Sequence, residues 1–341
     1  MQMQSNITSS NNDSPLVSVV IPVYNVEDYI VEALSSVTAQ SYQNLEILIV
    51  DDESPDNSIS LVQQQFDDPR IKIIRQKNRG LAGARNTGIR HASGTFIAFL
   101  DSDDSWTKDK IEKHIQIMLE QPNYGVSFSS SLFIDEQSQS LNKIQAPYKK
   151  SDYQAADIFC RNPVGNGSAP VIRKGILEQI CFFDDNKQED GIAYSQYFNE
   201  SLRQSEDIDC WTRIAILTAT DFYYIDEPLT NYRLIHTSLS ADVDKQFSTW
   251  LIFLNHLETY APDFAKQYGP KAKAFQYRYL ARRSLFQGNA KNTLVFMGLA
   301  FKTKPTAMLF EFRKTLETLG AGLVLCLFPS KTQLSIVRKL L

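Results

Sequence analysis

Three closely spaced aspartates are the residues most suited to chemistry in this sequence. Asp101, Asp103 and Asp104 follow directly after the apolar residues 96–100. Carboxylates this close repel one another unless a cation or solvent absorbs their charge. Oxygen-only ligands suit Mg²⁺ or Mn²⁺, and Mg²⁺ typically keeps water and phosphate ligands as well. The alternative is a solvated acidic turn that caps the next helix, where Asp and Ser are favoured. The aspartates alone leave both interpretations open.

The elements that position this cluster can be predicted from the apolar pattern. Residues 16–23 and 46–50 are nearly continuous apolar runs, typical of strands covered on both faces, and residues 96–100 form a third. Residues 70–75 alternate as an edge strand does. Apolar residues at helical spacing separate these runs. Strands that alternate with helices predict an α/β fold with a doubly wound, Rossmann-like and mostly parallel central sheet, whose carboxyl edge binds ligands.

Composition places the chain among ordinary globular proteins. Of its 341 residues, 43% are hydrophobic and 22% are charged, and the formal net charge is -4. That charge argues against a nucleic-acid binder, which usually carries a basic footprint. A polyanionic ligand would therefore need local cations or a metal. The cysteines are widely spaced without a CxxC pair, which favours free thiols in a reducing compartment and indicates no zinc site. They are Cys160, Cys181, Cys210 and Cys326.

The ends of the chain indicate a cytoplasmic protein. Residues 1–14 are polar and lack the basic and apolar parts of a signal peptide, so we expect a disordered tail. The longest uncharged apolar run, residues 319–328, is shorter than the ~18 residues of a membrane span. Such a run is usually a buried core element, and a contact with the membrane surface is the minority interpretation.

Four motifs together resemble family 2 glycosyltransferases of the GT-A fold. They are IPVYN at residues 21–25, IVDDESPDNS at 49–58, NRGLAGARNTGI at 78–89 and FLDSDDSW at 99–106. A single pair of aspartates is weak support, because acidic turns are common. Four motifs in the right order, at the ends of consecutive strands, are a strong signal. The resemblance covers roughly residues 15–235 and implies an inverting, metal-assisted transferase that uses a nucleotide-sugar, usually a UDP-sugar.

The resemblance also implies a nucleotide pocket along the strand ends. The end of the first strand lies beside the base and ribose, although its tyrosine could simply be a packed aromatic. An aspartate at the end of the second strand accepts hydrogen bonds from the uracil ring NH or a ribose hydroxyl, because carboxylates only accept. The usual glycine after that pair is Glu53 here, which leaves the local turn open. The implied nucleotide-sugar contacts are Pro22, Tyr24, Asn25, Asp51, Asp52, Arg79, Gly80, Arg85, Asn86, Asp101 and Ser102.

The acidic cluster is expected to carry Mn²⁺ or Mg²⁺. By the resemblance, Asp103 is the first metal ligand, Asp101 contacts ribose or metal-bound water, and Asp104 ligates or orients. The bound metal would neutralise the diphosphate and stabilise the leaving UDP. His236 lies in the family's closing motif, from which histidine can reach the diphosphate or metal, and neutral imidazole is a good ligand. A structural role for this histidine is about equally expected.

The second half of the catalytic region should supply the base. Of two Glu–Asp pairs, Glu206–Asp207 heads a helical pattern, whereas Glu189–Asp190 does not. We therefore expect Asp207 as general base, with Glu206 beside it, and a helix N-terminus that lowers its pKa. An ordinary helix start is the alternative. Two tryptophans are predicted to line the acceptor and sugar pocket, and for the first of them a core role is equally expected. They are Trp106 and Trp211.

These patterns predict four parts in the chain. Residues 1–14 are the tail, residues 15–240 form the catalytic domain, and residues 241–341 form a helical C-terminal region. Within the catalytic domain, residues 15–105 bind the nucleotide-sugar and residues 106–240 bind the acceptor. The C-terminal helices are expected to pack on the catalytic domain or on another subunit. The alternative is a peripheral contact at the inner face of the membrane, toward lipid-linked acceptors.

The predicted function is transfer of a single sugar to a glycan or lipid-linked acceptor in polysaccharide and cell-envelope glycan biosynthesis. No QxxRW sequence follows residue 207, which argues against a processive polymerase. A sugar-nucleotide nucleotidyltransferase would need a Gly-rich loop after the first strand, and residues 22–30 contain acids but no glycine. A non-catalytic scaffold of a glycan assembly is the other alternative, although such a relic would be expected to have lost part of the aspartate set. The sequence does not identify the donor sugar, the acceptor or the oligomeric state.

Overall fold

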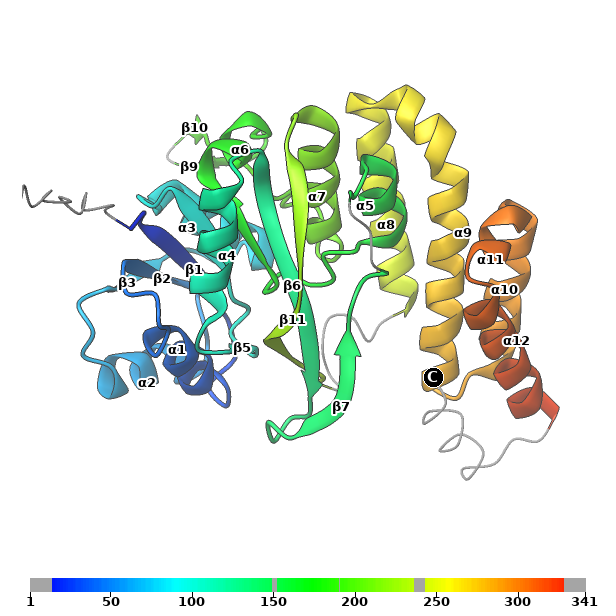
Figure 1. The fold of residues 1–341 in the computed structure, drawn as a ribbon, viewed down its shortest axis with the longest axis horizontal. Coiled ribbons are helices and arrows are strands. Elements are labelled where there is room, and N and C mark those ends of the chain that lie inside the picture. Colours follow the sequence, from blue (N-terminus) through cyan, green and yellow to red (C-terminus); the bar gives the residue numbers. More distant parts are fainter. Residues whose placement is uncertain (1–13, 149–151, 190, 236–242, 328–341) are drawn as a thin grey trace, which may run out of the picture.

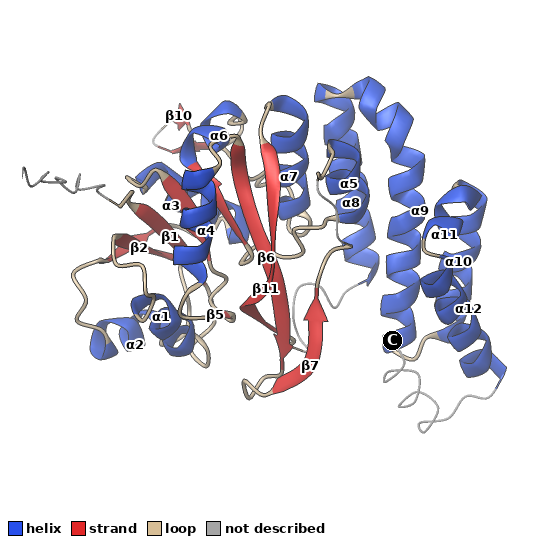
Figure 2. Cartoon of the chain, viewed as in Figure 1, coloured by secondary structure: helices blue, strands red, loops and turns tan. Residues whose placement is uncertain are grey.

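A curled nine-stranded sheet organises residues 14–148, 152–189, 191–235 and 243–327, the part of the chain that the computed structural model describes (Figures 1 and 2). Its strand order is β3-β2-β1-β4-β8-β6-β11-β5, and β7 pairs with β6. The strands are β1 (Val17–Val23), β2 (Leu45–Asp51), β3 (Ile71–Arg75), β4 (Phe96–Phe99), β5 (Ser105–Trp106), β6 (Tyr124–Ile134), β7 (Ser140–Gln145), β8 (Pro170–Arg173) and β11 (Asp221–Arg233).

The first half of the sheet is parallel, as predicted. Strand β1 pairs in parallel with β2 and β4, and β3 adds to β2 as the edge strand. Every residue of β1 is buried, which agrees with its continuous apolar sequence. Because these strands run the same way, the residues that follow β1, β2 and β4 meet at one edge.

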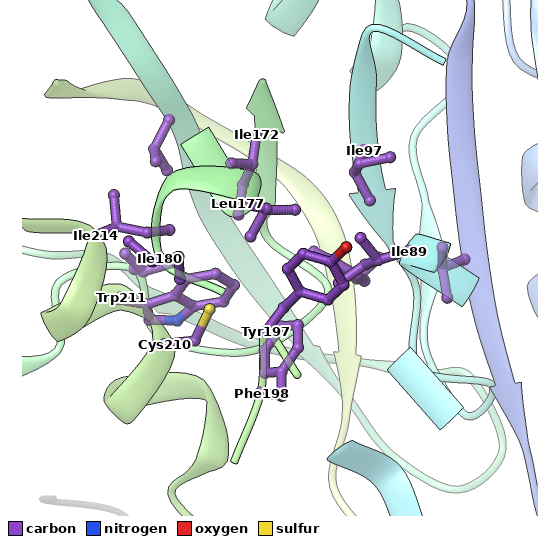
Figure 3. Close-up of a cluster of buried hydrophobic side chains, with 14 of the residues drawn as sticks. Ile89, Ile97, Ile172, Leu177, Ile180, Tyr197, Phe198, Cys210, Trp211 and Ile214 are labelled. Atoms are coloured by element: carbon purple, nitrogen blue, oxygen red, sulfur yellow. The ribbon is translucent and has the colours of Figure 1, made fainter. Parts of the chain in front are cut away.

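Helices cover both faces of the sheet. Along β1, Val19 and Ile21 belong to a core with α1 and α4, whereas Val20 belongs to a core with α3 and α7. This division follows from the alternation of side chains across a strand. Trp211 and Ile89 lie in the second core (Figure 3). The helices of this half are α1 (Ile30–Thr38), α2 (Ser58–Gln65), α3 (Gly80–His91), α4 (Lys110–Glu120), α5 (Ala155–Arg161), α6 (Lys174–Gln179) and α7 (Glu206–Leu217).

The second half of the sheet mixes strand directions. Strand β8 runs antiparallel between β4 and β6, and β11 pairs with β6 in parallel, with register shifts. The long loop before α7 contains a small hairpin, β9 (Gln188–Glu189) and β10 (Ile192–Ala193). This arrangement brings the β6 and β11 ends to the same edge as the end of β4.

The C-terminal region is helical and packs on the catalytic half. Its core includes Phe253 of α8, which meets Phe159 of α5 with ring centroids 5.7 Å apart. The predicted boundary at residue 240 lies outside the described residues. No helix in the described ranges is both long and apolar enough to pass through a bilayer. The helices are α8 (Val243–Tyr260), α9 (Pro262–Phe286), α10 (Ala290–Thr303), α11 (Pro305–Phe310) and α12 (Phe312–Leu327).

Candidate active site

A buried arginine joins the two acidic motifs at the carboxyl edge of the sheet. Arg85 of α3 places Nη2 2.5 Å from Asp101 Oδ1 and Nη1 2.8 Å from Glu206 Oε1. Only 1% of its side chain is exposed. Asp101 follows β4, whereas Glu206 begins α7, so one guanidinium fixes the distance between the two motifs. Two carboxylates balance its charge in this buried setting.

Glycines allow this close approach. A Cβ atom on Gly88 would lie 2.2 Å from Val20 Cγ1, so only glycine lets α3 lie so near β1. A Cβ atom on Gly167 would lie 2.2 Å from Arg85 Nη2. The small side chains within residues 78–89 therefore let the helix pack closely against the sheet, as expected. Gly167, outside this motif, makes room for the guanidinium.

The loop after β4 is held by residues distant in sequence. Ser168 Oγ accepts the Asp101 N–H at 3.0 Å and donates to Asp104 Oδ2 at 2.6 Å. The Arg233 N–H donates to Asp104 Oδ1 at 2.9 Å, and Arg233 Nε donates to the Asp103 carbonyl at 2.7 Å. Both Asp104 oxygens therefore accept bonds from the protein. Of the two roles expected for Asp104, ligating or orienting, these contacts favour orienting the loop.

Burial and mutual repulsion raise the pKa of two of the three aspartates in this loop. Burial raises the pKa of Asp103 to about 6, and the negative charge of Asp101 adds to the shift. Burial also raises the pKa of Asp104 well above its usual range, helped by the Asp103 carboxylate. Arg233 and Arg85 oppose the shift at Asp103 without cancelling it.

At the end of the edge where the nucleotide is expected, Asp51 and Asp52 have different roles. Asp52 is buried and accepts the N–H groups of Arg79 and Gly80, both at 2.8 Å, so it holds the N-terminus of α3. Asp51 accepts one backbone bond, from Ser54 at 3.0 Å, forms an ion pair with the exposed Arg75, whose Nε lies 3.6 Å from Oδ2, and stays partly exposed. Asp51 is therefore the member of the pair with free acceptor capacity.

Two non-glycine residues at this edge adopt left-handed backbone conformations. Glu53 has φ 61° and Asn25 has φ 56°. Glu53 thus makes the turn that the usual glycine would make. Its left-handed backbone is strained, and strained residues of this kind are concentrated at functional sites. Tyr24 is 50% exposed beside this turn, and the buried carbonyl of Pro22 accepts the Ser102 hydroxyl at 2.7 Å. Tyr24 is free for a ligand, whereas Pro22 and Ser102 shape the edge.

Three expected nucleotide contacts serve the protein itself. Asn86 is fully buried, and its Oδ1 accepts the N–H groups of Tyr197 at 2.9 Å and Phe198 at 2.8 Å. Both terminal nitrogens of Arg85 donate to carboxylates, as described above. Arg79 donates to Gln76 at 2.9 Å and to Thr87 at 2.8 Å. The nucleotide role expected of Arg85 and Asn86 is wrong because they are buried, and Arg79 likewise binds protein groups.

The expected base lies at the start of α7, close to Arg85. Burial raises the pKa of Glu206 to about 7, against the attraction of Arg85. Burial raises the pKa of Asp207 as well, again opposed by Arg85. The expected lowering of the Asp207 pKa is therefore wrong, since desolvation outweighs the helix terminus. A more basic Asp207 is better suited to accept a proton.

The tryptophan assignments need correction. Trp106 is only 4% exposed, belongs to the core under α1 and α4, and donates its indole N–H to the Ser168 carbonyl at 3.0 Å. Trp211 is fully buried beside Cys210 and Ile214 (Figure 3). Neither side chain lines an acceptor or sugar pocket, because neither reaches the surface. His236, which was expected to reach the metal or the diphosphate, lies outside the described residues.

Two residues of the site were missed as functional residues. Ser168, in the loop before β8, and Arg233, at the end of β11, hold the acidic loop, and both are buried. The available signal for Arg233 was its place three residues before His236, beside the family's closing motif. Among the described residues, no three His, Cys, Asp or Glu side chains converge in a way that could hold a metal ion.

Similarity to known proteins decides the family. The sequence model described as Glycosyl transferase family 2 matches residues 18–181. TuaG of Bacillus subtilis, which carries the name teichuronic acid biosynthesis glycosyltransferase, is 32% identical over 245 residues, 71% of this chain and 88% of TuaG. The chain belongs to glycosyl transferase family 2. As a family 2 glycosyltransferase it is a transferase enzyme, which confirms the predicted class.

Other relatives match this family 2 glycosyltransferase over shorter shares of their length. WfgD of Escherichia coli, a UDP-Glc:alpha-D-GlcNAc-diphosphoundecaprenol beta-1,3-glucosyltransferase, is 44% identical over 138 residues, 40% of this chain and 53% of WfgD. Uncharacterized glycosyltransferases of Rickettsia felis and Rickettsia conorii are both 34% identical, and the chain spans 33% of the length of each.

Solved structures confirm the fold. S. aureus TarS 1-349 in complex with UDP-GlcNAc has a TM-score of 0.56 at 17% identity, over 90% of each chain. The mannosyltransferase PcManGT from Pyrobaculum calidifontis, in complex with GDP-Man and Mn²⁺, has a TM-score of 0.56 at 18% identity, over 94% of this chain and 89% of PcManGT. At such identities the likeness shows the fold alone, which is GT-A as predicted.

Proposed function

We propose that this family 2 glycosyltransferase moves a single sugar from a UDP-sugar to the hydroxyl of a glycan or lipid-linked acceptor, with inversion and with a divalent metal. The observation that carries the proposal is the Arg85 bridge. It holds the donor-side Asp101 and the base-side Glu206 on one guanidinium, at 2.5 Å and 2.8 Å. A transferase needs these two sides at a fixed separation, because a sugar must fit between them in an attack geometry.

The nucleotide would lie along the edge from β1 to β4. Asp51 has acceptor capacity for a uracil NH or a ribose hydroxyl, and the exposed ring of Tyr24 can pack against a base. TarS was solved with UDP and with UDP-GlcNAc, and WfgD is named for UDP-Glc. These names support UDP as the nucleotide proposed here, whereas the sugar stays open.

Asp101 and Asp103 fit a divalent cation. Their hard oxygens suit Mn²⁺ or Mg²⁺, and the pKa of Asp103 is raised although Arg233 and Arg85 lower it, so these arginines do not fully balance the negative charge of the loop. Since only two carboxylates are offered, phosphate and water would complete the ligand set. A bound cation would supply Lewis-acid stabilisation of the diphosphate leaving group. PcManGT, solved with Mn²⁺, supports this cofactor class.

Asp207 would act as general base on the acceptor side. It takes the proton of the acceptor hydroxyl, whose oxygen bonds to the anomeric carbon from the side opposite UDP. The bond from that carbon to the UDP oxygen breaks, so the configuration inverts. Arg85 would hold Glu206 and Asp101 in place during this exchange, and its positive charge favours the ionised form of Asp207.

The names of the relatives support the proposed acceptor class. TuaG is named for teichuronic acid biosynthesis, and WfgD for an acceptor on diphosphoundecaprenol. We therefore place this transferase in cell-envelope glycan biosynthesis, with the cytoplasmic side of the membrane as its site of action. Acceptors of the WfgD kind are anchored in lipid, so a peripheral contact with the membrane would bring enzyme and acceptor together.

Calorimetric titration of UDP, with and without Mn²⁺, tests the donor site. The wild-type protein is expected to bind UDP in a Mn²⁺-dependent way. Asp103→Asn should weaken that binding by about tenfold or more, because it removes a proposed metal ligand. GDP titrated in parallel tests the choice of nucleotide, and tighter binding of GDP than UDP would contradict it.

Asp67→Asn is the matched control. Asp67 is an exposed aspartate between α2 and β3, at the opposite edge of the sheet, so its substitution should leave UDP binding unchanged. Absence of UDP binding under every condition would contradict the proposal and favour a scaffold. Binding that ignores Mn²⁺ would keep the nucleotide site and overturn the metal assignment.

A further inference from the structure

An exposed apolar face covers the last two described helices. Its six side chains are between 50% and 70% exposed. We call these six the α11–α12 apolar face: Leu309, Phe310, Phe312, Leu316, Leu323 and Leu327. A contiguous apolar patch on a water-soluble surface usually marks an interaction site.

The spacing of these residues makes a stripe along α12. At 100° per residue, the four members from 312 to 327 fall within about 60° of one another. The buried side of the helix is a different one, formed by Thr315, Thr318 and Leu325 against the neighbouring helices. The helix therefore has one apolar side that the fold uses and a second that it leaves in solvent.

The charge of this end of the chain is opposite to the rest. Residues 287–341 contain eight Lys or Arg against two Glu and no Asp, a formal charge of +6. Because the whole chain is -4, residues 1–286 carry -10. A strongly cationic segment in an acidic protein points to an anionic partner.

Lysines also lie close to the apolar face. Lys302, in the last turn of α10, and Lys304, just before α11, are exposed and have no carboxylate partner in the described part of the chain. Lys271 Nζ lies 5.6 Å from the centre of the Phe310 ring. The two glutamates near the stripe are already paired, Glu311 with Arg278 and Glu317 with Arg313.

We propose that the α11–α12 apolar face rests on an anionic lipid surface. Exposed Leu and Phe side chains would enter the boundary between headgroups and acyl chains, while the surrounding lysines contact anionic headgroups. A second copy of the chain is a poorer occupant, because a symmetric dimer would bring two cationic faces together. No membrane span is needed for such binding.

The position of the face agrees with the proposed acceptor. The carboxyl-terminal end of α12 and the turn between β6 and β7 both reach the lower side of the molecule in Figure 1. Strands β6 and β11 also end on that side. The carboxyl-terminal end of α12 therefore lies on the same side of the molecule as the ends of the strands in the acceptor half.

Co-sedimentation of the full-length protein with vesicles tests the proposal. The wild type should bind phosphatidylcholine vesicles that contain phosphatidylglycerol and bind pure phosphatidylcholine weakly. The triple variant Phe312→Ser, Leu316→Ser, Leu323→Ser should lose about tenfold or more in vesicle partition. These side chains are at least half exposed, so the variant should fold. Its UDP binding should match the wild type, which separates this inference from the proposed donor site.

Leu119→Ser with Leu217→Ser is the matched control. Both leucines are about half exposed, at 54% and 47%, but lie on α4 and α7 away from the face, so vesicle binding should be unchanged. No vesicle binding by the wild type would overturn the proposal, and so would equal binding by the triple variant. Sedimentation velocity without lipid tests whether a second copy of the chain binds this face instead. A dimer that the triple variant breaks, with no vesicle binding, would assign the face to a second copy and overturn the lipid surface.

Discussion

Arg85 shows how one side chain can serve both halves of a transfer reaction. Its guanidinium is buried and touches Asp101 on the donor side and Glu206 on the acceptor side. The two carboxylates raise its pKa in spite of burial, so it stays charged. A lysine could not replace it, because a single ammonium group cannot reach two carboxylates in a fork.

The buried carboxyls predict an unusual pH dependence of stability. Folding raises the pKa of Glu206 from 4.5 to about 7 and that of Asp103 from 3.8 to about 6. At a pH between the unfolded-state and folded-state pKa values, the folded protein binds protons that the unfolded chain has released. The unfolding free energy is therefore greater at low pH and falls as the pH rises. We expect the unfolding free energy of the metal-free protein to fall by on the order of 2 kcal/mol from about pH 5 to about pH 8.

Urea denaturation across this pH range measures the effect. Glu206→Gln should flatten the decline, because it removes one of the titrating groups, whereas Glu178→Gln on the exposed surface of α6 should not. Glu311 works in the opposite direction, with its pKa lowered to about 2, but it acts only below the chosen range. An equal decline in Glu206→Gln and the wild type would contradict the assignment.

At the scale of elements, Asp52 connects β2 to α3. Its carboxylate accepts two N–H groups at the start of the helix and the Gln76 amide at 2.6 Å. Asp52→Ala should therefore lower the unfolding free energy by about 2–3 kcal/mol, since it leaves buried donors without an acceptor. Urea denaturation followed by circular dichroism measures this loss.

The neighbouring Asp51 provides the contrast. Asp51→Asn should change stability by less than about 1 kcal/mol, because Asp51 accepts a single backbone bond. It should weaken UDP binding about tenfold. Equal losses of stability in the two variants would contradict the division of roles between the adjacent aspartates.

Sequence reasoning succeeded where the pattern is local. The continuous apolar runs of β1 and β2 and the helical spacing of α4 are visible within one element, and the structure confirms them. It failed where a side chain finds its partner far along the chain. Arg85 and Glu206 are 121 positions apart, and Asn86 binds the main chain 112 positions later, so no local pattern could assign them. The mixed second half of the sheet depends on similar distant pairings.

The whole molecule should unfold as one unit. The C-terminal core contains Phe253 from α8 together with Phe159 and Leu202 from the catalytic half. Phe253→Ala should cost about 3–4 kcal/mol, because it opens a cavity in this shared core. The loss should appear as one transition in both circular dichroism and tryptophan fluorescence, since Trp250 reports on α8, whereas Trp211 on α7 and Trp106 on β5 report on the catalytic half.

Ile252→Ala controls for the loss of side-chain bulk on the same helix. Ile252 is 47% exposed, so the substitution should cost less than about 1 kcal/mol. Two separated transitions in Phe253→Ala, with the helical region melting first, would show that the two regions fold independently.

The contacts of Arg233 have a consequence for biosynthesis. Arg233 reaches back 130 positions to the carbonyl of Asp103, and its N–H also fixes Asp104. A growing chain on the ribosome therefore holds its acidic loop without this support until the last strand of the sheet has emerged. Carboxylates that would attract stray divalent ions are set in their final geometry only when the whole catalytic half is available, so a truncated translation product would lack an ordered acidic loop.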